Sequence, residues 1–258
     1  MNRSRTGAGF TLVEMLVVIG VIGILAGLLV PVLNNAREVA RETRCIANLK
    51  AMGTGVVLYV QAYDNYLPAC GPSSDDTLGT YKVWYRALLP YTENWLVYAC
   101  PTKYPSTLDI PDVVEKKKQP SNMKWHEVHY GMNYTFMGVD KNTALVGRTI
   151  QMDELNNPAR ILYIADGGLF KAGSSGSSDK LDPKLEDPIS VRDGGIVFPM
   201  DDGKLPADKP TISPRHRGST MCLFLDGHVE KLETMKILSV KRDDPNCLYA
   251  VPPPTPVK

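Results

Sequence analysis

The sequence lacks an excess of charge of either sign. Its 258 residues carry 29 Lys and Arg against 28 Asp and Glu, so the formal net charge at pH 7 is only +1. Proteins that bind nucleic acids or anionic surfaces through long-range electrostatics carry a pronounced basic balance. This composition gives no such signal, and we expect no nucleic acid among the partners.

The motifs of several large enzyme classes are also missing. The sequence contains no nucleophile elbow, no P-loop, no dinucleotide-binding fingerprint and no internal repeat. The segment His126-Glu127-Val128-His129 resembles a zincin motif only superficially, because its histidines stand three apart in a stretch that reads as extended. Zincin chemistry needs histidines four apart on a helix. We therefore expect that the protein is not an enzyme.

Cysteine is scarce, and the five cysteines form an odd number. A compartment outside the cytoplasm would permit disulfides. Cys70 and Cys100 both lie in turn-rich segments and are one possible pair. Cys45 is expected on a helix and Cys222 in a core strand, where a free buried thiol is common. Cys247 has no expected place, so the connectivity of the five stays open.

One long apolar run stands out from this ordinary composition. Between Phe10 and Val30 the only side chains that are not apolar are Thr11 and Glu14. As a helix the run is about 30 Å long, which matches the hydrocarbon thickness of a bilayer. A signal peptide is a poor alternative, because its apolar core is only about 7–15 residues long. A plain anchor leaves Glu14 unexplained, because an unpaired carboxylate in lipid is costly.

The segment Gly9-Phe10-Thr11-Leu12-Val13-Glu14 resembles the processing site of type IV prepilins and of type II secretion pseudopilins. The resemblance implies that prepilin peptidase removes residues 1–9 by cutting between Gly9 and Phe10, and methylates the new amino terminus. It also implies a single-pass inner-membrane protein with its C-terminal part in the periplasm and, after assembly, in a fibre. The charges flanking the run do not settle this orientation by themselves.

Glu14 would be the fifth residue of the processed chain. A carboxylate on one subunit can pair with the Phe10 amine of a neighbour, which removes two isolated charges from an apolar setting. The alternative is that Glu14 reaches the headgroups from its place near the helix end. The resemblance implies as partners further copies, other pilin-like subunits, an inner-membrane assembly platform and membrane lipid.

An amphipathic pattern continues the apolar run as far as Tyr63, so we expect one helix over residues 10–63, with residues 10–30 in the membrane. Pro31 lies at the junction and is expected to kink the helix. The outer half should pack on a domain. The apolar face comprises Ala36, Val39, Ala40, Thr43, Ile46, Ala47, Leu49, Gly53, Val56, Val57, Val60 and Tyr63.

Residues 64–258 are expected to form a globular α+β domain, so the fold class is α+β and pilin-like, with the long helix packed on a small antiparallel sheet. Trp84 to Tyr98 predicts a short helix and then a turn. Ile161–Ala165 predicts a strand that ends at Asp166-Gly167. Residues 173–209 are expected to be a long exposed loop and 250–258 a flexible tail.

Two apolar runs near the C-terminus, 221–225 and 228–232, are joined by Asp226-Gly227. This is a hairpin signature, in which both turn positions are expected to have positive φ. His216, followed nine residues later by Asp226-Gly227, resembles the H-X9-DG element of prepilin-like families of Planctomycetes and related bacteria. Further segments that resemble these families are Cys100-Pro101, Tyr130-Gly131-Met132-Asn133 and Asn157-Pro158-Ala159-Arg160.

The imidazole and carboxylate groups of His216, Asp226 and His228 are weak candidates for a metal site. The competing interpretation is that Asp226 makes the turn and His216 ties the preceding loop to it. Calcium is a second possibility, because acidic loops supply the oxygen ligands that it prefers, although no EF-hand pattern is present. The loop acids are Asp179, Asp182, Glu186, Asp187, Asp193, Asp201, Asp202 and Asp208.

These observations favour a structural subunit of a pilus-like fibre, with a pseudopilin of a type II secretion-like system as the first choice. A type IV pilin for adhesion or motility is the alternative within this class. Rivals from other classes are a membrane-tethered protein that binds calcium or glycan, and a tethered metallohydrolase using His216, Asp226 and His228.

Overall fold

The computed structural model describes residues 11–68, 84–102, 128–133, 150–170, 186–187, 195–196, 210–240 and 247–248. The chain divides into two compact units, the first ending at Arg41 and the second beginning at Glu42. One helix, α1 (Leu12–Ala62), contributes residues to both units. The processing residues Gly9 and Phe10 lie outside the described residues, as do residues 104–120 and most of 173–209.

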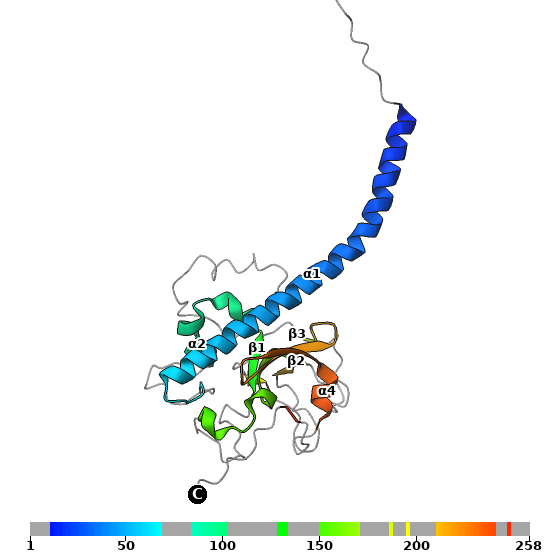
Figure 1. The fold of residues 1–258 in the computed structure, drawn as a ribbon. Coiled ribbons are helices and arrows are strands. Elements are labelled where there is room, and N and C mark those ends of the chain that lie inside the picture. The colour runs from blue at the N-terminus through cyan, green and yellow to red at the C-terminus, as the bar shows by residue number, and fades with distance from the viewer. Residues whose placement is uncertain are drawn as a thin grey trace, which may run out of the picture. The chain divides into compact units, whose positions relative to one another are not determined.

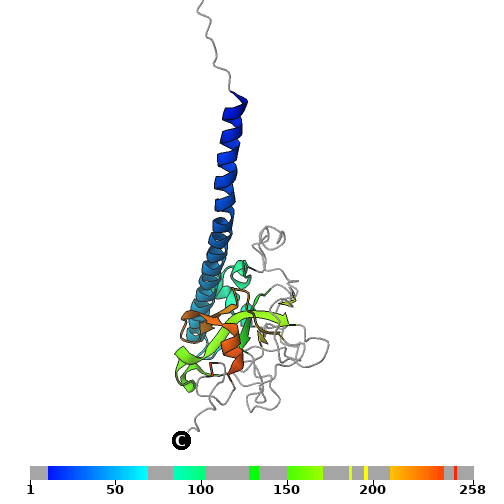
Figure 2. The ribbon, with the colours of Figure 1, turned by 90° about the vertical axis from the view of Figure 1, so that its right-hand side faces the viewer.

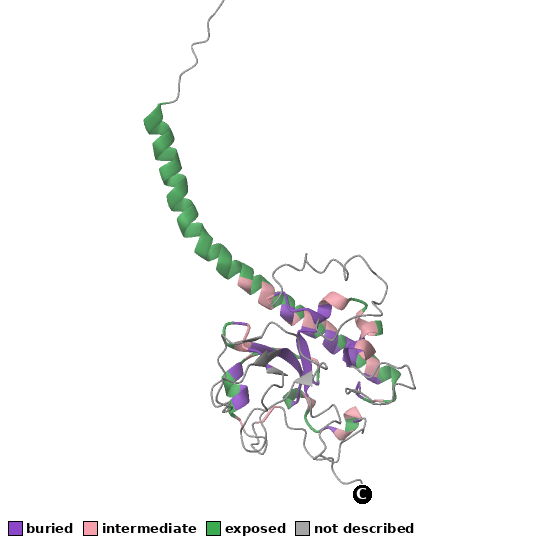
Figure 3. Cartoon of the chain, turned by 180° about the vertical axis from the view of Figure 1, so that it is seen from behind, coloured by how far each residue is buried: buried purple, intermediate pink, exposed green. Residues whose placement is uncertain are grey.

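The first unit, as far as the structure describes it, is the apolar part of α1. Its large hydrophobic side chains are exposed, from Leu12 at 80% to Leu33 at 46%, and in Figure 3 this part of the helix is coloured as exposed throughout. Pro31 lies inside the helix and does not end it. Among the described residues, α1 is the one helix long and apolar enough to cross a membrane.

In the second unit, the remainder of α1 packs along the sheet (Figure 1). Its buried residues recur at helical spacing: Cys45, Leu49, Met52, Gly53, Gly55, Val56 and Val60. The expected apolar face is therefore confirmed at Leu49, Gly53, Val56 and Val60. Ile46 is half-buried, and the expectation was wrong at the exposed residues Ala36, Val39, Ala40, Thr43, Ala47, Val57 and Tyr63. Cys45 and Met52 are buried as well, although the expected face did not include them.

Two glycines let α1 approach its neighbours closely. A Cβ on Gly53 would stand 3.0 Å from Leu223 Cδ1, and a Cβ on Gly55 would stand 3.0 Å from Thr92 Cγ2. Both distances are shorter than an ordinary van der Waals contact between carbons. Glycine at these positions therefore sets the distance between α1 and the elements beside it.

The sheet confirms the α+β class, because its four central strands are antiparallel in the order β1-β2-β6-β7. Their bounds are β1 (Tyr130–Asn133), β2 (Leu162–Phe170), β6 (Ser219–Phe224) and β7 (Val229–Glu233). Three short strands extend it: β3 (Glu186–Asp187) and β5 (Pro210–Ile212) pair antiparallel with β2, while β4 (Gly195–Ile196) pairs parallel with β1. The parallel pair departs from a purely antiparallel sheet.

Strand β6 is buried on both faces of the sheet, because its side chains alternate between two cores. Met221 and Leu223 belong to the larger core with α1, whereas Cys222 and Phe224 belong to a smaller core with α4 (Thr234–Ser239). Figure 2 shows the sheet and α4 from a second direction. The second unit is thus built in layers around one sheet.

Aromatic side chains of the segment from Trp84 to Tyr98, for which the sequence predicts a short helix and then a turn, pack into the larger core. The segment forms α2 (Trp84–Thr92) and the short 3-10 helix η2 (Trp95–Tyr98). The Trp84 and Tyr98 rings pack edge to face at 5.8 Å, and both are fully buried. Two further 3-10 turns, η6 (Met152–Glu154) and η7 (Pro158–Arg160), precede β2.

Two local expectations were wrong. β2 does not end at Asp166 but continues to Phe170, because β5 and β3 pair with its second half. The predicted hairpin is confirmed, but its turn differs from the expected one, because only Gly227 has a positive φ, 90°. The Gly227 N–H donates to the Phe224 carbonyl, and this turn needs a positive φ at one position only. Asp166 therefore lies in the middle of a buried strand.

Candidate functional site

Among the described residues, two places combine polar chemistry with an unusual environment: the first turn of α1 and a polar cluster inside the second unit. The first turn holds Glu14. Its Oε2 accepts hydrogen bonds from the Thr11 backbone N–H at 2.8 Å and from Thr11 Oγ1 at 2.7 Å, while Glu14 N–H donates to Thr11 Oγ1 at 3.3 Å. This reciprocal arrangement is a capping box, which satisfies amides that the helix cannot satisfy itself.

The capping box gives Glu14 a role within its own chain that sequence analysis did not anticipate, although the spacing Thr-x-x-Glu was visible. The carboxylate has no charged partner among the described residues of the first unit. It stays available for one, since hydrogen bonds to neutral donors leave its charge uncompensated. The pairing expected between Glu14 and Phe10 of another subunit remains a prediction.

The polar cluster of the second unit consists of Cys45, Cys100, Asp166 and His216, all fully buried. Each comes from a different element. Cys45 lies on α1, Cys100 follows η2, Asp166 lies in β2, and His216 precedes β6. Amphipathic spacing turns Cys45 inward with Leu49, and a backbone bridge between His216 and Ser219 holds the imidazole at the start of the β6 hairpin.

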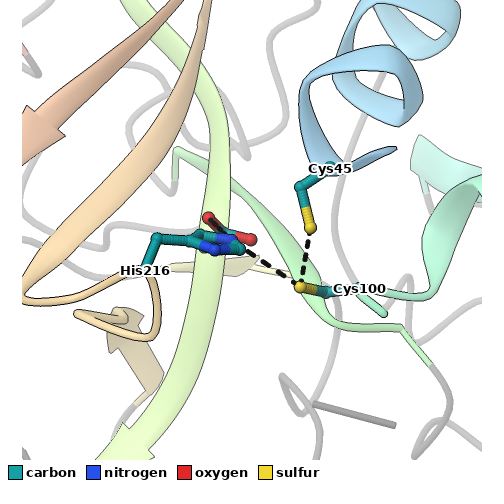
Figure 4. A group of neighbouring side chains, drawn as sticks. Cys45, Cys100 and His216 are labelled. Carbon is teal, nitrogen blue, oxygen red and sulfur yellow. Dashed lines mark hydrogen bonds and ion pairs between the residues drawn. The ribbon is translucent and has the colours of Figure 1, made fainter. Parts of the chain in front are cut away.

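The four side chains meet at one point, with one donor atom from each within 4.8 Å of all the others. The Cys45 and Cys100 sulfurs are 2.9 Å apart, and Cys100 Sγ lies 3.8 Å from His216 Nε2, as Figure 4 shows. The same Nε2 lies 3.2 Å from Asp166 Oδ2. The Nε2 proton is therefore shared between a carboxylate and a sulfur.

Surrounding groups fix these four side chains in place. The Met221 backbone N–H donates to Asp166 Oδ2 at 2.9 Å, and the Cys100 N–H donates to His129 Nδ1 at 2.9 Å. Thr102 Oγ1 lies 3.5 Å from His216 Nδ1. Asp166 Oδ1 is buried and has no hydrogen-bond partner among the described residues. An unpartnered carboxylate oxygen in a protein interior is uncommon and calls for a cause.

The side chains of the cluster shift one another's pKa values. Burial alone would raise the pKa of Cys100, but hydrogen bonds from Cys45 and His216 and the charge of Arg215 outweigh it and lower that pKa. The hydrogen bond to Cys100 and burial raise the pKa of Cys45. Burial alone would lower the pKa of His216, but Asp166 and Cys100 raise it to about 10. Cys100 is thus the thiol of the pair that ionises first, beside an imidazolium.

Burial and the nearby Cys100 raise the pKa of Asp166, against the opposing effect of His216 and Arg215. Arg215 donates to the carbonyl oxygens of His129, at 3.3 Å, and Gly167. This positive charge lies close enough to act on both Asp166 and Cys100. The cluster therefore combines two thiols and a carboxyl group with one imidazole, all fully buried, and the Arg215 guanidinium lies beside it.

Such a donor set can do two things chemically. Two thiols, an imidazole and a carboxylate can together hold a borderline-soft cation such as Zn²⁺. Alternatively, the two thiols can be oxidised to a disulfide in an oxidising compartment. Full burial leaves no room for a substrate, so the cluster does not support the tethered metallohydrolase considered from the sequence.

The three metal candidates proposed from the sequence are not brought together. His216 is buried against Asp166, whereas Asp226 and His228 are exposed and pair with each other, with His228 Nδ1 2.5 Å from Asp226 Oδ1. Asp226 Oδ1 also accepts from the His228 N–H at 3.1 Å, which agrees with its expected role in the turn. His129 is buried beside Cys100. Cys70 and the acidic loop side chains lie outside the residues whose side chains are described.

Sequence analysis missed three of the four cluster residues. Cys100 was considered as a possible partner of Cys70 and as part of a family-like Cys-Pro segment, and Cys45 as a free thiol. Asp166 was read as the end of a strand rather than as part of it. A signal was present, since Cys45 stands four residues before Leu49 on the buried face, and Asp166 directly follows an apolar strand.

Comparisons with known proteins agree with the resemblance at the N-terminus. A family described as the prokaryotic N-terminal methylation motif matches residues 5–30. A family described as a protein of unknown function (DUF1559) matches residues 34–103, a stretch that includes Cys45 and Cys100. Neither description names an enzymatic activity. No curated protein and no solved structure matches the chain.

Proposed function

Because the chain is a type IV prepilin-like protein, we propose that its mature form is a structural subunit of a pilus-like fibre. The observation that carries this proposal is the methylation motif on residues 5–30, which coincides with an apolar helix whose large side chains are exposed in the single chain. Exposed apolar surface of this extent needs either lipid or other copies of the helix to cover it.

The proposed sequence of events begins in the inner membrane. Prepilin peptidase cuts between Gly9 and Phe10 and methylates the Phe10 amine, with the second unit in the periplasm. An assembly platform then extracts the subunit, and the helices bundle with those of neighbouring copies and other pilin-like subunits. Gly20, Gly23 and Gly27 lie on this part of the helix, and residues without a side chain allow close approach of helices in a bundle.

Glu14 is the proposed assembly contact. In the single chain its carboxylate caps α1 through Thr11, and in the fibre it would exchange a neutral partner for the Phe10 amine of a neighbour. An ion pair in an apolar setting is favourable relative to leaving either charge alone. The exchange makes Glu14 a contact whose charge matters only once two subunits meet.

The first test is the N-terminus of the purified protein. The full chain, expressed with and without a prepilin peptidase, is analysed by mass spectrometry. We expect methylated Phe10 as the first residue only with the peptidase, and Met1 without it. A chain that retains Met1 in the presence of an active peptidase would contradict the proposal.

The second test separates assembly from capping at Glu14. Glu14→Gln keeps an oxygen that accepts the Thr11 hydrogen bonds but removes the charge, whereas Thr11→Val removes the side-chain cap and keeps the charge. We expect normal processing in both variants, loss of fibres in Glu14→Gln as seen by shearing and electron microscopy, and retention of fibres in Thr11→Val. Fibres in both variants would contradict the role of the Glu14 charge in assembly, whereas a processed wild-type chain that forms no fibres would favour a monomeric tethered protein that binds calcium or glycan.

Within the pilin-like class, we propose a pseudopilin of a type II secretion-like system rather than a surface pilin for adhesion or motility. The two differ in what disappears when the chain is deleted from its native cell. A pseudopilin deletion leaves secreted proteins in the periplasm, whereas a surface pilin deletion removes external fibres and leaves secretion intact. The second result would favour the type IV pilin.

A further inference from the structure

We propose that Cys45, Cys100, Asp166 and His216 form a buried structural zinc site that fastens the outer half of α1 to the sheet of the second unit. The proposal concerns the second unit alone and is independent of processing at Gly9. It rests on the donor set, the distances between the donor atoms and the unpartnered oxygen of Asp166.

The donor set matches the ion. Structural zinc sites take four protein ligands from cysteine, histidine and carboxylate side chains. Thiolates and imidazole together favour zinc over the hard cations Mg²⁺ and Ca²⁺, which prefer oxygen. All four side chains are fully buried, which leaves no position for water or substrate and so indicates a structural rather than a catalytic site.

Two of the distances already match a tetrahedron of ligands. Zinc bonds of about 2.0–2.3 Å place a nitrogen and an oxygen about 3.3 Å apart, and a nitrogen and a sulfur about 3.6 Å apart. The structure has 3.2 Å between His216 Nε2 and Asp166 Oδ2, and 3.8 Å between Nε2 and Cys100 Sγ. The ion would replace the Nε2 proton that now lies between these acceptors.

The sulfur pair alone does not decide between zinc and a disulfide. The sulfurs are 2.9 Å apart. Two thiolates on one zinc ion stand about 3.8 Å apart, and a disulfide bond is about 2.05 Å long. Either outcome requires a movement of about 0.9 Å, which small rotations about the cysteine χ1 angles can supply.

The other half of the cluster favours the ion. A disulfide would use two of the four side chains and leave Asp166 Oδ1 buried without a hydrogen-bond partner among the described residues. A cation would use all four side chains, because it binds the carboxylate, both thiolates and the Nε2 lone pair that His216 gains when it loses the Nε2 proton. A carboxylate that binds the ion through both oxygens would also give Asp166 Oδ1 a partner, and buried charges in proteins are paired or coordinate metals.

Neighbouring groups hold the four proposed ligands in position. Thr102 Oγ1, 3.5 Å from His216 Nδ1, can accept the Nδ1 proton and leave Nε2 as the ligand atom. The Met221 N–H orients Asp166, and the Cys100 N–H is held by His129 Nδ1. Orientation of the ligands by such partners is typical of metal sites.

The test is metal content in the full chain, purified in detergent without added reductant or chelator. Inductively coupled plasma mass spectrometry should find one zinc per chain. Asp166→Asn and His216→Gln should each weaken zinc binding more than about tenfold and so lower the zinc content. Substitution of a residue that only orients a ligand already costs about 10–100-fold in affinity. The matched controls His228→Gln and Cys222→Ser, an exposed histidine and a buried cysteine outside the cluster, should keep the zinc.

A readout on the unmodified chain covers variants that fail to fold. Exchange of zinc for Co²⁺ should give thiolate-to-cobalt charge-transfer absorption in the wild-type chain, and this band should survive Cys222→Ser. Peptide mapping that finds a Cys45–Cys100 disulfide with no zinc would overturn the proposal. Zinc that stays bound in both Asp166→Asn and His216→Gln would overturn it as well, since the ion would then lie elsewhere.

Discussion

The two parts of α1 belong to one continuous helix but have opposite surroundings. Before Arg41 every large hydrophobic side chain that the structure describes is exposed, whereas from Cys45 onward the helix presents a buried stripe to the sheet. One helix therefore has two different environments along its length. Apolar residues on all sides suit lipid or a bundle of helices, and apolar residues on one side suit a globular core.

The exposed and the buried part of α1 obtain their stability from different contacts. The first unit derives none from its own tertiary contacts, so its side chains are expected to matter for membrane insertion and assembly. The second unit has a packed core and follows the rules of a soluble domain. The same substitution in the two halves should therefore have different effects on the free energy of unfolding of the second unit. Matched pairs of substitutions test this expectation.

The largest expected difference is between two leucines. Leu49 is fully buried in the core, and Leu28 is 67% exposed. Leu49→Ala should lower the free energy of unfolding of the second unit by about 2–5 kcal/mol, the usual cost of a cavity in a core. Leu28→Ala should change it by less than about 0.5 kcal/mol. Denaturation of the full chain in detergent, followed by near-UV circular dichroism, measures both.

Equal effects of the two leucine substitutions would contradict the division of α1 into two environments. Trp84, which is buried beside Tyr98, supplies a near-UV signal that reports on the second unit alone. The comparison therefore does not depend on unfolding of the apolar half.

A smaller difference is expected between two glycines of the same helix. A Cβ at Gly53 would stand 3.0 Å from Leu223 Cδ1, while a Cβ at Gly27 would meet nothing within 4 Å. Gly53→Val should destabilise the second unit by about 1–3 kcal/mol through overpacking. Gly27→Val should leave its unfolding unchanged. An unchanged midpoint for Gly53→Val would show that α1 can move away from the β6–β7 hairpin at little cost.

Sequence patterns predicted the elements better than the interior. The apolar run, the amphipathic continuation to Ala62 and the hairpin around Gly227 are local patterns, so hydrophobic periodicity and turn chemistry sufficed. β2 was predicted too short. Its second half contains Asp166-Gly167-Gly168, which reads as a turn, and only pairing with β5 and β3 keeps it extended.

The polar cluster could not be predicted from the sequence for a related reason. Its four residues are spread from Cys45 to His216, and no spacing between them follows from a helix or strand period. They meet because α1, η2, β2 and β6 pack together, which is a property of the tertiary fold. The H-X9-DG spacing pointed to His216 but joined it to Asp226, whereas the structure joins it to Asp166.

The smallest expected effect concerns an ion pair at the start of the second unit. Lys231 Nζ, on β7, lies 2.8 Å from Glu42 Oε1, and the two side chains are 35% and 15% exposed. Partial exposure lets solvent screen the pair, so a double-mutant cycle of Glu42→Ala and Lys231→Ala should give a coupling of about 0.2–1 kcal/mol. The matched pair Glu233–Lys236 is more exposed, and its cycle should give no measurable coupling. A coupling at Glu42–Lys231 as large as the Leu49→Ala effect would mean that charge, rather than apolar packing, begins the contact between α1 and the sheet.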